Sequence, residues 1–175
     1  MDYEKEAKRY RKKSIIESSA STVISLNYDQ SSIEKLLPHR APFLLIDTIK
    51  GIDYKQQAII GESTVDPDNP ILKGHFPGYP VWPGVLQVEM IGQLAICYYS
   101  LFRQKTEENK NSGAAFGIRA LKIYHTLFQY EVLPGDTVEI CAKVMDEDEY
   151  RFKGIGQIIN DGKICTVAIA EFYIV

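Results

Sequence analysis

Two side chains able to exchange protons lie within the segment GHFPGYPVWPGVLQVEMIGQLA, residues 74–95. His75 stands in a loop crowded with glycine and proline, and Glu89 stands inside the apolar run that follows. Histidine and carboxylic acids often act as general base and general acid near neutral pH. As a pair, they could remove a proton from one carbon of a substrate and deliver a proton to a departing hydroxyl group.

The sequence between these two residues predicts the start of a helix. Pro83 suits the first helical position, because its fixed φ fits a helix and its missing N–H is not needed there. The backbone N–H groups of Gly84 and Val85 are then expected to lie free at the positive end of the helix dipole. Such donors can hold an oxygen that gains negative charge, for example the enolate oxygen of a thioester.

Each of the two side chains also has a structural interpretation. An unpaired ionised carboxylate in an apolar helix is costly, so Glu89 is expected to find a partner, to surface, or to stay protonated as a general acid requires. His75 can instead be a turn residue whose ring nitrogens both bond to the backbone. Their combination beside a predicted oxyanion-binding helix start favours chemistry over structure.

The whole chain has the composition of one globular domain. Its 175 residues suffice for a single core, and its net charge of −3 offers no basic excess for nucleic acid. The N-terminus lacks the apolar segment of a secretory signal, and no uninterrupted apolar run predicts a membrane span. We expect Cys97, Cys141 and Cys165 to be reduced, buried thiols of a cytoplasmic protein.

Residues 1–30 form a polar leader ahead of a single domain expected over residues 31–175. The composition of the leader is typical of a solvated helix or a frayed arm, and a binding tail is the alternative. Its basic cluster consists of Lys8, Arg9, Arg11, Lys12 and Lys13.

The remaining patterns predict one long helix and several strands. The helix from Val85 to Phe102 has hardly any polar face, so it is expected to be buried on all sides. TVEICAKVM, residues 137–145, alternates as a strand does, and Asn160, Asp161 and Gly162 predict a hairpin between two further strands. We therefore predict an α+β fold in which an antiparallel sheet wraps a long central helix.

Three segments together resemble the FabZ-type β-hydroxyacyl-acyl-carrier-protein dehydratases of the hotdog superfamily. They are LLPHRAPFLLIDTI, GHFPGYPVWPGVLQVEMIGQLA and RFKGIGQIINDGKIC, in the family's order, within a likeness that runs from about Ile33 to the C-terminus. The resemblance implies that His75 handles the α-proton, that Glu89 protonates the departing 3-hydroxyl, and that the Gly84 N–H, with Val85 beside it, binds the thioester oxygen. It also implies a homodimer with sites shared across the interface, and commonly a hexamer of three dimers.

The resemblance further implies the substrate and its carrier. The reaction would convert (3R)-3-hydroxyacyl thioesters on acyl carrier protein to trans-2-enoyl thioesters, without metal or organic cofactor. The chemistry would take place in a tunnel lined by Phe76, Trp82, Pro83 and Val88. An acidic carrier needs cations near the tunnel mouth; the candidates are the leader cluster and the pair Arg119 and Lys122, of which we favour the pair.

Some residues depart from the family pattern and leave the pathway open between fatty acid and specialised lipid or polyketide synthesis. Trp82 replaces a smaller residue, and the tyrosine that gates the tunnel in some members would fall near Ala114 or Ala115. FabA-type dehydratase-isomerases carry Asp at the position of Glu89, which disfavours isomerisation here. His39 and Arg40 are interpreted as structural, and His125 as a surface or strand residue.

Two other classes of hotdog protein remain as alternatives. A thioesterase would hydrolyse the acyl thioester, but such enzymes typically lack the loop that carries His75. A non-catalytic acyl-binding module would bind the substrate without changing it.

Overall fold

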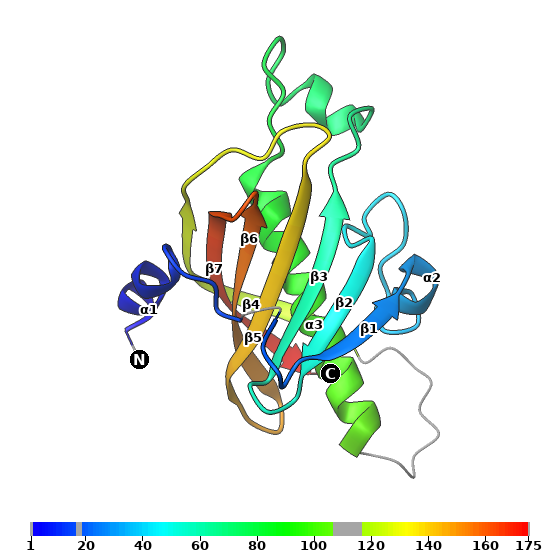
Figure 1. Ribbon diagram of the computed structural model, residues 1–175, viewed down its shortest axis with the longest axis vertical. Coiled ribbons are helices and arrows are strands. Elements are labelled where there is room, and N and C mark those ends of the chain that lie inside the picture. Colours follow the sequence, from blue (N-terminus) through cyan, green and yellow to red (C-terminus); the bar gives the residue numbers. More distant parts are fainter. Residues whose placement is uncertain (1, 17–18, 107–116, 175) are drawn as a thin grey trace.

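The computed structural model describes residues 2–16, 19–106 and 117–174, which form an antiparallel seven-stranded sheet curled around a long helix (Figure 1). The strand order is β1-β2-β3-β5-β6-β7-β4, so β1 and β4 are the two edges. The helices are α1 (Tyr3–Tyr10), α2 (Gln30–Ile33), η1 (Pro70–Lys73) and α3 (Gly84–Thr106). The strands are β1 (Ile24–Tyr28), β2 (Thr48–Asp53), β3 (Ala58–Thr64), β4 (Ile118–Phe128), β5 (Thr137–Glu147), β6 (Arg151–Asn160) and β7 (Lys163–Ile174). The predicted α+β architecture is confirmed.

Helix α3 packs against the inner face of the sheet and forms the main core with it. The alternation predicted for β5 is confirmed, since Val138, Ile140 and Ala142 are buried in this core. The helix approaches β6 so closely that a Cβ added at Gly156 would lie 2.1 Å from Ile91 Cγ2 and 2.8 Å from the Cys141 carbonyl oxygen. A glycine at this position is therefore needed to seat the helix on the sheet.

The expectation that α3 is buried on all sides is wrong at its N-terminal half. Val85 is 72% exposed, and the Glu89 side chain is 33% exposed. The cause is geometric, because one curled sheet covers only part of the helix surface. The open face lies beside the edge strand β4, whose Leu121, Ile123 and Phe128 are also exposed.

Helix α3 also has the length and hydropathy that a membrane span requires. The stretch Gly84–Lys105 has a mean hydropathy of 1.3, but 67% of its apolar window is buried inside the fold. Because the sheet covers most of that window, we interpret α3 as the core helix of a globular domain.

Residues 2–16 of the leader pack on the outer face of the sheet, as helix α1 and the turn after it, and the side chains of the basic cluster stay exposed. Ala7, Ile15 and Ile16 are buried there in a second apolar cluster with side chains of β3, β5, β6 and β7. Residues 24–28, assigned from the sequence to the leader, form the edge strand β1. Cys141 is buried for the same reason, because the leader covers the side of β5 that it occupies.

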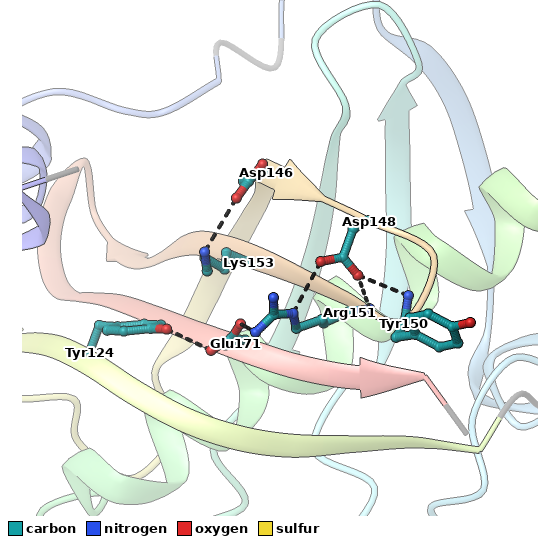
Figure 2. Close-up of polar contacts among 7 residues, drawn as sticks. All are labelled: Tyr124, Asp146, Asp148, Tyr150, Arg151, Lys153 and Glu171. Atoms are coloured by element: carbon teal, nitrogen blue, oxygen red, sulfur yellow. Dashed lines mark hydrogen bonds and ion pairs between the residues drawn. The ribbon is translucent and has the colours of Figure 1, made fainter.

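The outer face also holds a polar network across β4, β7 and β6 (Figure 2). Glu171 is only 3% exposed, and its carboxylate accepts a hydrogen bond from Tyr124 Oη at 2.6 Å and pairs with Arg151 at 3.4 Å. Arg151 pairs in addition with Asp148 at 3.1 Å. Tyr124 and Arg151 both act as donors, so the buried carboxylate of Glu171 has hydrogen-bonding partners.

The close approach of α3 to β6 predicts a large effect of one methyl group. Gly156→Ala should destabilise the protein by about 2–3 kcal/mol, because Ile91 or the backbone of β5 must move. Chemical denaturation measures this loss, and Ile91→Ala should restore part of it in the double variant. Gly154→Ala is the matched control on the same strand, since its added Cβ would meet nothing closer than 3.5 Å. Equal stabilities of the two alanine variants would contradict this packing.

Candidate active site

His75 lies in the loop between η1 and α3, where its own loop holds its ring. Nδ1 lies 2.8 Å from the carbonyl oxygen of Val81, and the Val81 N–H donates in return to the His75 carbonyl at 2.8 Å. A carbonyl oxygen can only accept, so Nδ1 carries the proton and Nε2 of the neutral ring keeps its lone pair. This is the arrangement of a general base.

The start of α3 lies beside this histidine. Leu86 and Gln87 donate their N–H groups to the Pro83 carbonyl, whereas Gly84 and Val85 precede the first such bond, and no acceptor within the described residues takes their N–H groups. Phe128 packs so tightly here that a Cβ added at Gly84 would lie 2.7 Å from its ring. The helix start therefore offers two free donors beside an aromatic wall.

The base and the donors line one cavity of about 390 Å³. A thioester whose carbonyl oxygen met the N–H groups of Gly84 and Val85 would have its α-carbon within the same space as His75. The predicted tunnel residues Trp82 and Pro83 also line it. The cavity is formed by His75, Val81, Trp82, Pro83, Gly84, Val85, Gln87, Phe128, Gln129, Tyr130 and Glu131.

Glu89 lies one turn further along α3 and lines a second, more apolar cavity of about 330 Å³. The predicted tunnel residue Val88 lines this cavity too, together with Ile123, Phe128 and Phe172 of the sheet. Val85 and Phe128 line both cavities. A single chain therefore places the base and the carboxylate in two adjoining spaces.

The carboxylate of Glu89 is oriented by Gln93, a residue that the sequence interpretation missed. Gln93 Nε2 donates to Glu89 Oε1 at 2.9 Å and to the Phe43 carbonyl at 2.8 Å, while Gln93 Oε1 accepts the Leu45 N–H at 2.9 Å. Gln93 is fully buried, so its amide is fixed by the backbone of residues 43–45. Its spacing from Glu89, one helical turn on the same face, was the available signal.

His39 was interpreted as structural, but its Nε2 lies 3.5 Å from Glu89 Oε1. Its Nδ1 is buried without a hydrogen-bond partner in the described structure. Arg40 does hold the backbone, since it donates to the carbonyls of Leu37 and His39. Two side chains, Gln93 and His39, thus face the carboxylate of Glu89.

The other predicted site residues lie outside the two cavities. Phe76 is exposed and stacks on the ring of His75, with centroids 4.2 Å apart. Arg119 and Lys122 are exposed on β4. Ala114 and Ala115, near the expected gate, fall outside the described residues.

The cysteines do not take part in this site. All three are free and buried, and burial raises the pKa of the Cys97 and Cys141 thiols, which opposes thiolate formation. Within residues 2–16, 19–106 and 117–174, no three His, Cys, Asp or Glu side chains gather in a way that could hold a metal ion.

Comparisons with known proteins agree with the fold. The family model of the FabA-like domain matches residues 37–168. The 3-hydroxyacyl-[acyl-carrier-protein] dehydratase FabZ of Anaeromyxobacter sp. (strain K) is 35% identical over 144 residues, 82% of this chain and 87% of the relative. FabZ of Campylobacter curvus (strain 525.92) is 32% identical over 149 residues, 84% of this chain and 97% of the relative.

Solved structures give the same fold at low identity. The dehydratase heterocomplex ApeI:P from Xenorhabdus doucetiae matches with a TM-score of 0.66 at 19% identity, covering 82% of this chain and 90% of that chain. A mutant thioesterase from Pseudomonas aeruginosa matches with a TM-score of 0.55 at 12% identity, covering 85% and 94%. The antiparallel sheet wrapped around α3 is thus a hotdog fold. The chain belongs to the FabA-like family, among the relatives of the FabZ dehydratases.

The geometry around His75 predicts one tautomer. Nitrogen NMR of the imidazole rings at a pH where His75 is neutral should show the proton on Nδ1, because Val81 offers only a carbonyl acceptor. Comparison with His75→Ala assigns the signal among the three histidines. A proton on Nε2 would leave no lone pair facing the cavity and would contradict the role of base.

Proposed function

We propose that this protein is a 3-hydroxyacyl-[acyl-carrier-protein] dehydratase that converts (3R)-3-hydroxyacyl thioesters reversibly to trans-2-enoyl thioesters. One observation carries the proposal. A histidine with a free Nε2 lines the same cavity as the free N–H groups at the start of α3, Gly84 and Val85. A base beside an oxyanion site is what removal of a proton next to a thioester carbonyl requires.

The residues divide the work as follows. His75 Nε2 takes the proton from C2, and the electron pair moves toward the carbonyl oxygen held by Gly84 and Val85. As the C2–C3 double bond forms, the bond from C3 to its hydroxyl breaks, and Glu89 protonates that oxygen so that it leaves as water. Gln93 donates to Glu89 Oε1, which must therefore be an accepting oxygen. The transferable proton then belongs on Oε2.

The site is completed by a second copy of the chain. Glu89 and His75 line different cavities in one chain, and both cavities open near Val85, which is highly exposed. The edge strand β4 is unpaired on its outer side and carries exposed apolar residues, which favours pairing with the β4 of another subunit. His75 of one subunit then faces Glu89 of the partner, and three such dimers would form the hexamer common in the family.

The substrate arrives on an acyl carrier protein in the cytoplasm. The names of the FabZ relatives support this carrier, and the free, buried cysteines fit a reducing compartment. Arg119 and Lys122 are candidate contacts for the acidic carrier, since both are exposed on β4. Lys122 lies over the ring of Tyr124 at 4.7 Å, which leaves its ammonium at the surface.

A purified sample given a 3-hydroxyacyl N-acetylcysteamine thioester should produce the absorbance of the conjugated enoyl thioester. His75→Ala and Glu89→Gln should each lower kcat by about 100-fold or more, because each removes one of the two proton-transfer groups. Circular dichroism of the variants checks that the fold persists, and His125→Ala serves as a histidine control away from both cavities. Release of free thiol would instead indicate a thioesterase, and binding without reaction a non-catalytic module.

The shared site also predicts a dimer that depends on β4. Light scattering should give twice the mass of the chain or a multiple of it, and Ile123→Asp should shift the mass toward the monomer because it places a charge in the proposed interface. Ile24→Asp is the matched control, since it changes an exposed isoleucine on the opposite edge strand, β1. A fully active monomer would overturn the shared site.

A further inference from the structure

The turn that follows α1 in the leader lies at the rim of the His75 cavity. The carbonyl oxygen of Arg11 accepts a hydrogen bond from Gln129 Nε2 at 3.0 Å, and Gln129 lines that cavity. Gln129 Nε2 also donates to the Ile164 carbonyl at 2.9 Å, so its amide is fixed to the sheet as well. The residues that follow α1 are therefore held next to the proposed entrance.

The leader is anchored strongly enough to define this position. Gln157 of β6 is fully buried, and its Oε1 accepts the Ile15 N–H at 2.8 Å. Its Nε2 donates to the carbonyls of Tyr10 at 2.5 Å and Lys13 at 2.9 Å. One glutamine side chain thus binds the backbone on both sides of residues 11 and 12.

The five cations of the basic cluster, Lys8, Arg9, Arg11, Lys12 and Lys13, fall into two groups. Within α1, Lys8 pairs with Glu4 and Arg9 with Glu6, so their charges are largely balanced. Arg11, Lys12 and Lys13 are exposed and have no ion pair in the described part of the chain. These three residues, the basic turn, carry a net positive charge that the leader does not neutralise.

Other charges at the rim do not cancel the basic turn. Glu131 also lines the cavity, but its carboxylate accepts the hydroxyl of Tyr79 at 2.7 Å and contributes only one negative charge.

We propose that the basic turn docks the acidic carrier protein and the phosphate of its pantetheine arm at the entrance to the His75 cavity. This inference rests on the proposed dehydratase function and names the surface that delivers its substrate. Cations fixed within about 8–10 Å of an entrance act on an approaching anion despite physiological salt. Position favours the basic turn over Arg119 and Lys122, the pair preferred from the sequence, because Gln129 of the cavity wall binds the Arg11 carbonyl whereas that pair lines neither cavity.

Charge-reversal variants distinguish docking at the basic turn from an effect of the net charge of the protein. Arg11→Glu/Lys12→Glu should raise KM for a carrier-bound 3-hydroxyacyl substrate by about 10-fold at low salt, and the difference should shrink as salt rises. Lys35→Glu/Lys55→Glu changes the net charge equally at exposed positions outside the cavity and should change KM little. Both variants should turn over the N-acetylcysteamine thioester as the wild type does, because that substrate has no carrier.

A second variant keeps every charge of the basic turn and removes only the hydrogen bonds that hold it in place. Gln157→Leu loses three hydrogen bonds to the leader, so the basic turn should become sensitive to trypsin and KM for the carrier substrate should rise. Circular dichroism and the small substrate check that the domain remains folded and active.

The outcomes distinguish this inference from the proposed function. If the wild type fails to dehydrate the small thioester, the function itself is wrong. If it does so but the leader variant and the control variant have equal KM values for the carrier substrate, the docking surface is wrong. A loss on the small thioester in Arg11→Glu/Lys12→Glu would also overturn docking, because the leader would then shape the cavity.

Discussion

The structure depends on a mismatch between one helix and one sheet. Helix α3 is apolar on more of its surface than a single curled sheet can cover, so its N-terminal half keeps an open face around Val85. Apolar surface left in water is unfavourable, with a free-energy cost of roughly 25 cal/mol for each Å² that is not buried. The unpaired edge of β4 lies beside the open face. The same mismatch that favours a partner subunit also leaves room for two cavities along the helix.

The chemistry follows from where the open face lies. The helix start supplies free N–H groups only at its first residues, and the next turn supplies Glu89. Between the two, Phe128 packs against Gly84 and contributes to both cavities. In the proposed reaction, a substrate that uses His75 in one cavity and Glu89 in the other must cross this aromatic wall or reach Glu89 of the partner subunit. The second route needs no rearrangement of the core.

Local features were predictable from the sequence, and long-range ones were not. The hairpin at Asn160–Gly162 was predicted because turn geometry is local, and the structure gives Asp161 and Gly162 positive φ values of 47° and 72°. His75, Gly84 and Glu89 could be proposed as site residues from the sequence because they lie within one short segment. The packing of the leader on the sheet was not predicted, because its main anchor, Gln157, lies far away in the sequence. The approach of His39 to Glu89 was missed for the same reason, because the two residues are distant in the sequence and come close only in the folded chain.

The central claim is that His75 and Glu89 of different subunits form one site, and complementation of inactive variants tests it most directly. In a mixed dimer of His75→Ala and Glu89→Gln subunits, one site loses both groups and the other keeps an intact His75 from one chain and an intact Glu89 from its partner. Random exchange of subunits makes about half of the dimers mixed. Mixing the two inactive proteins should therefore restore about a quarter of wild-type turnover on the N-acetylcysteamine thioester. No recovery after verified subunit exchange would place both groups in one chain and contradict the account.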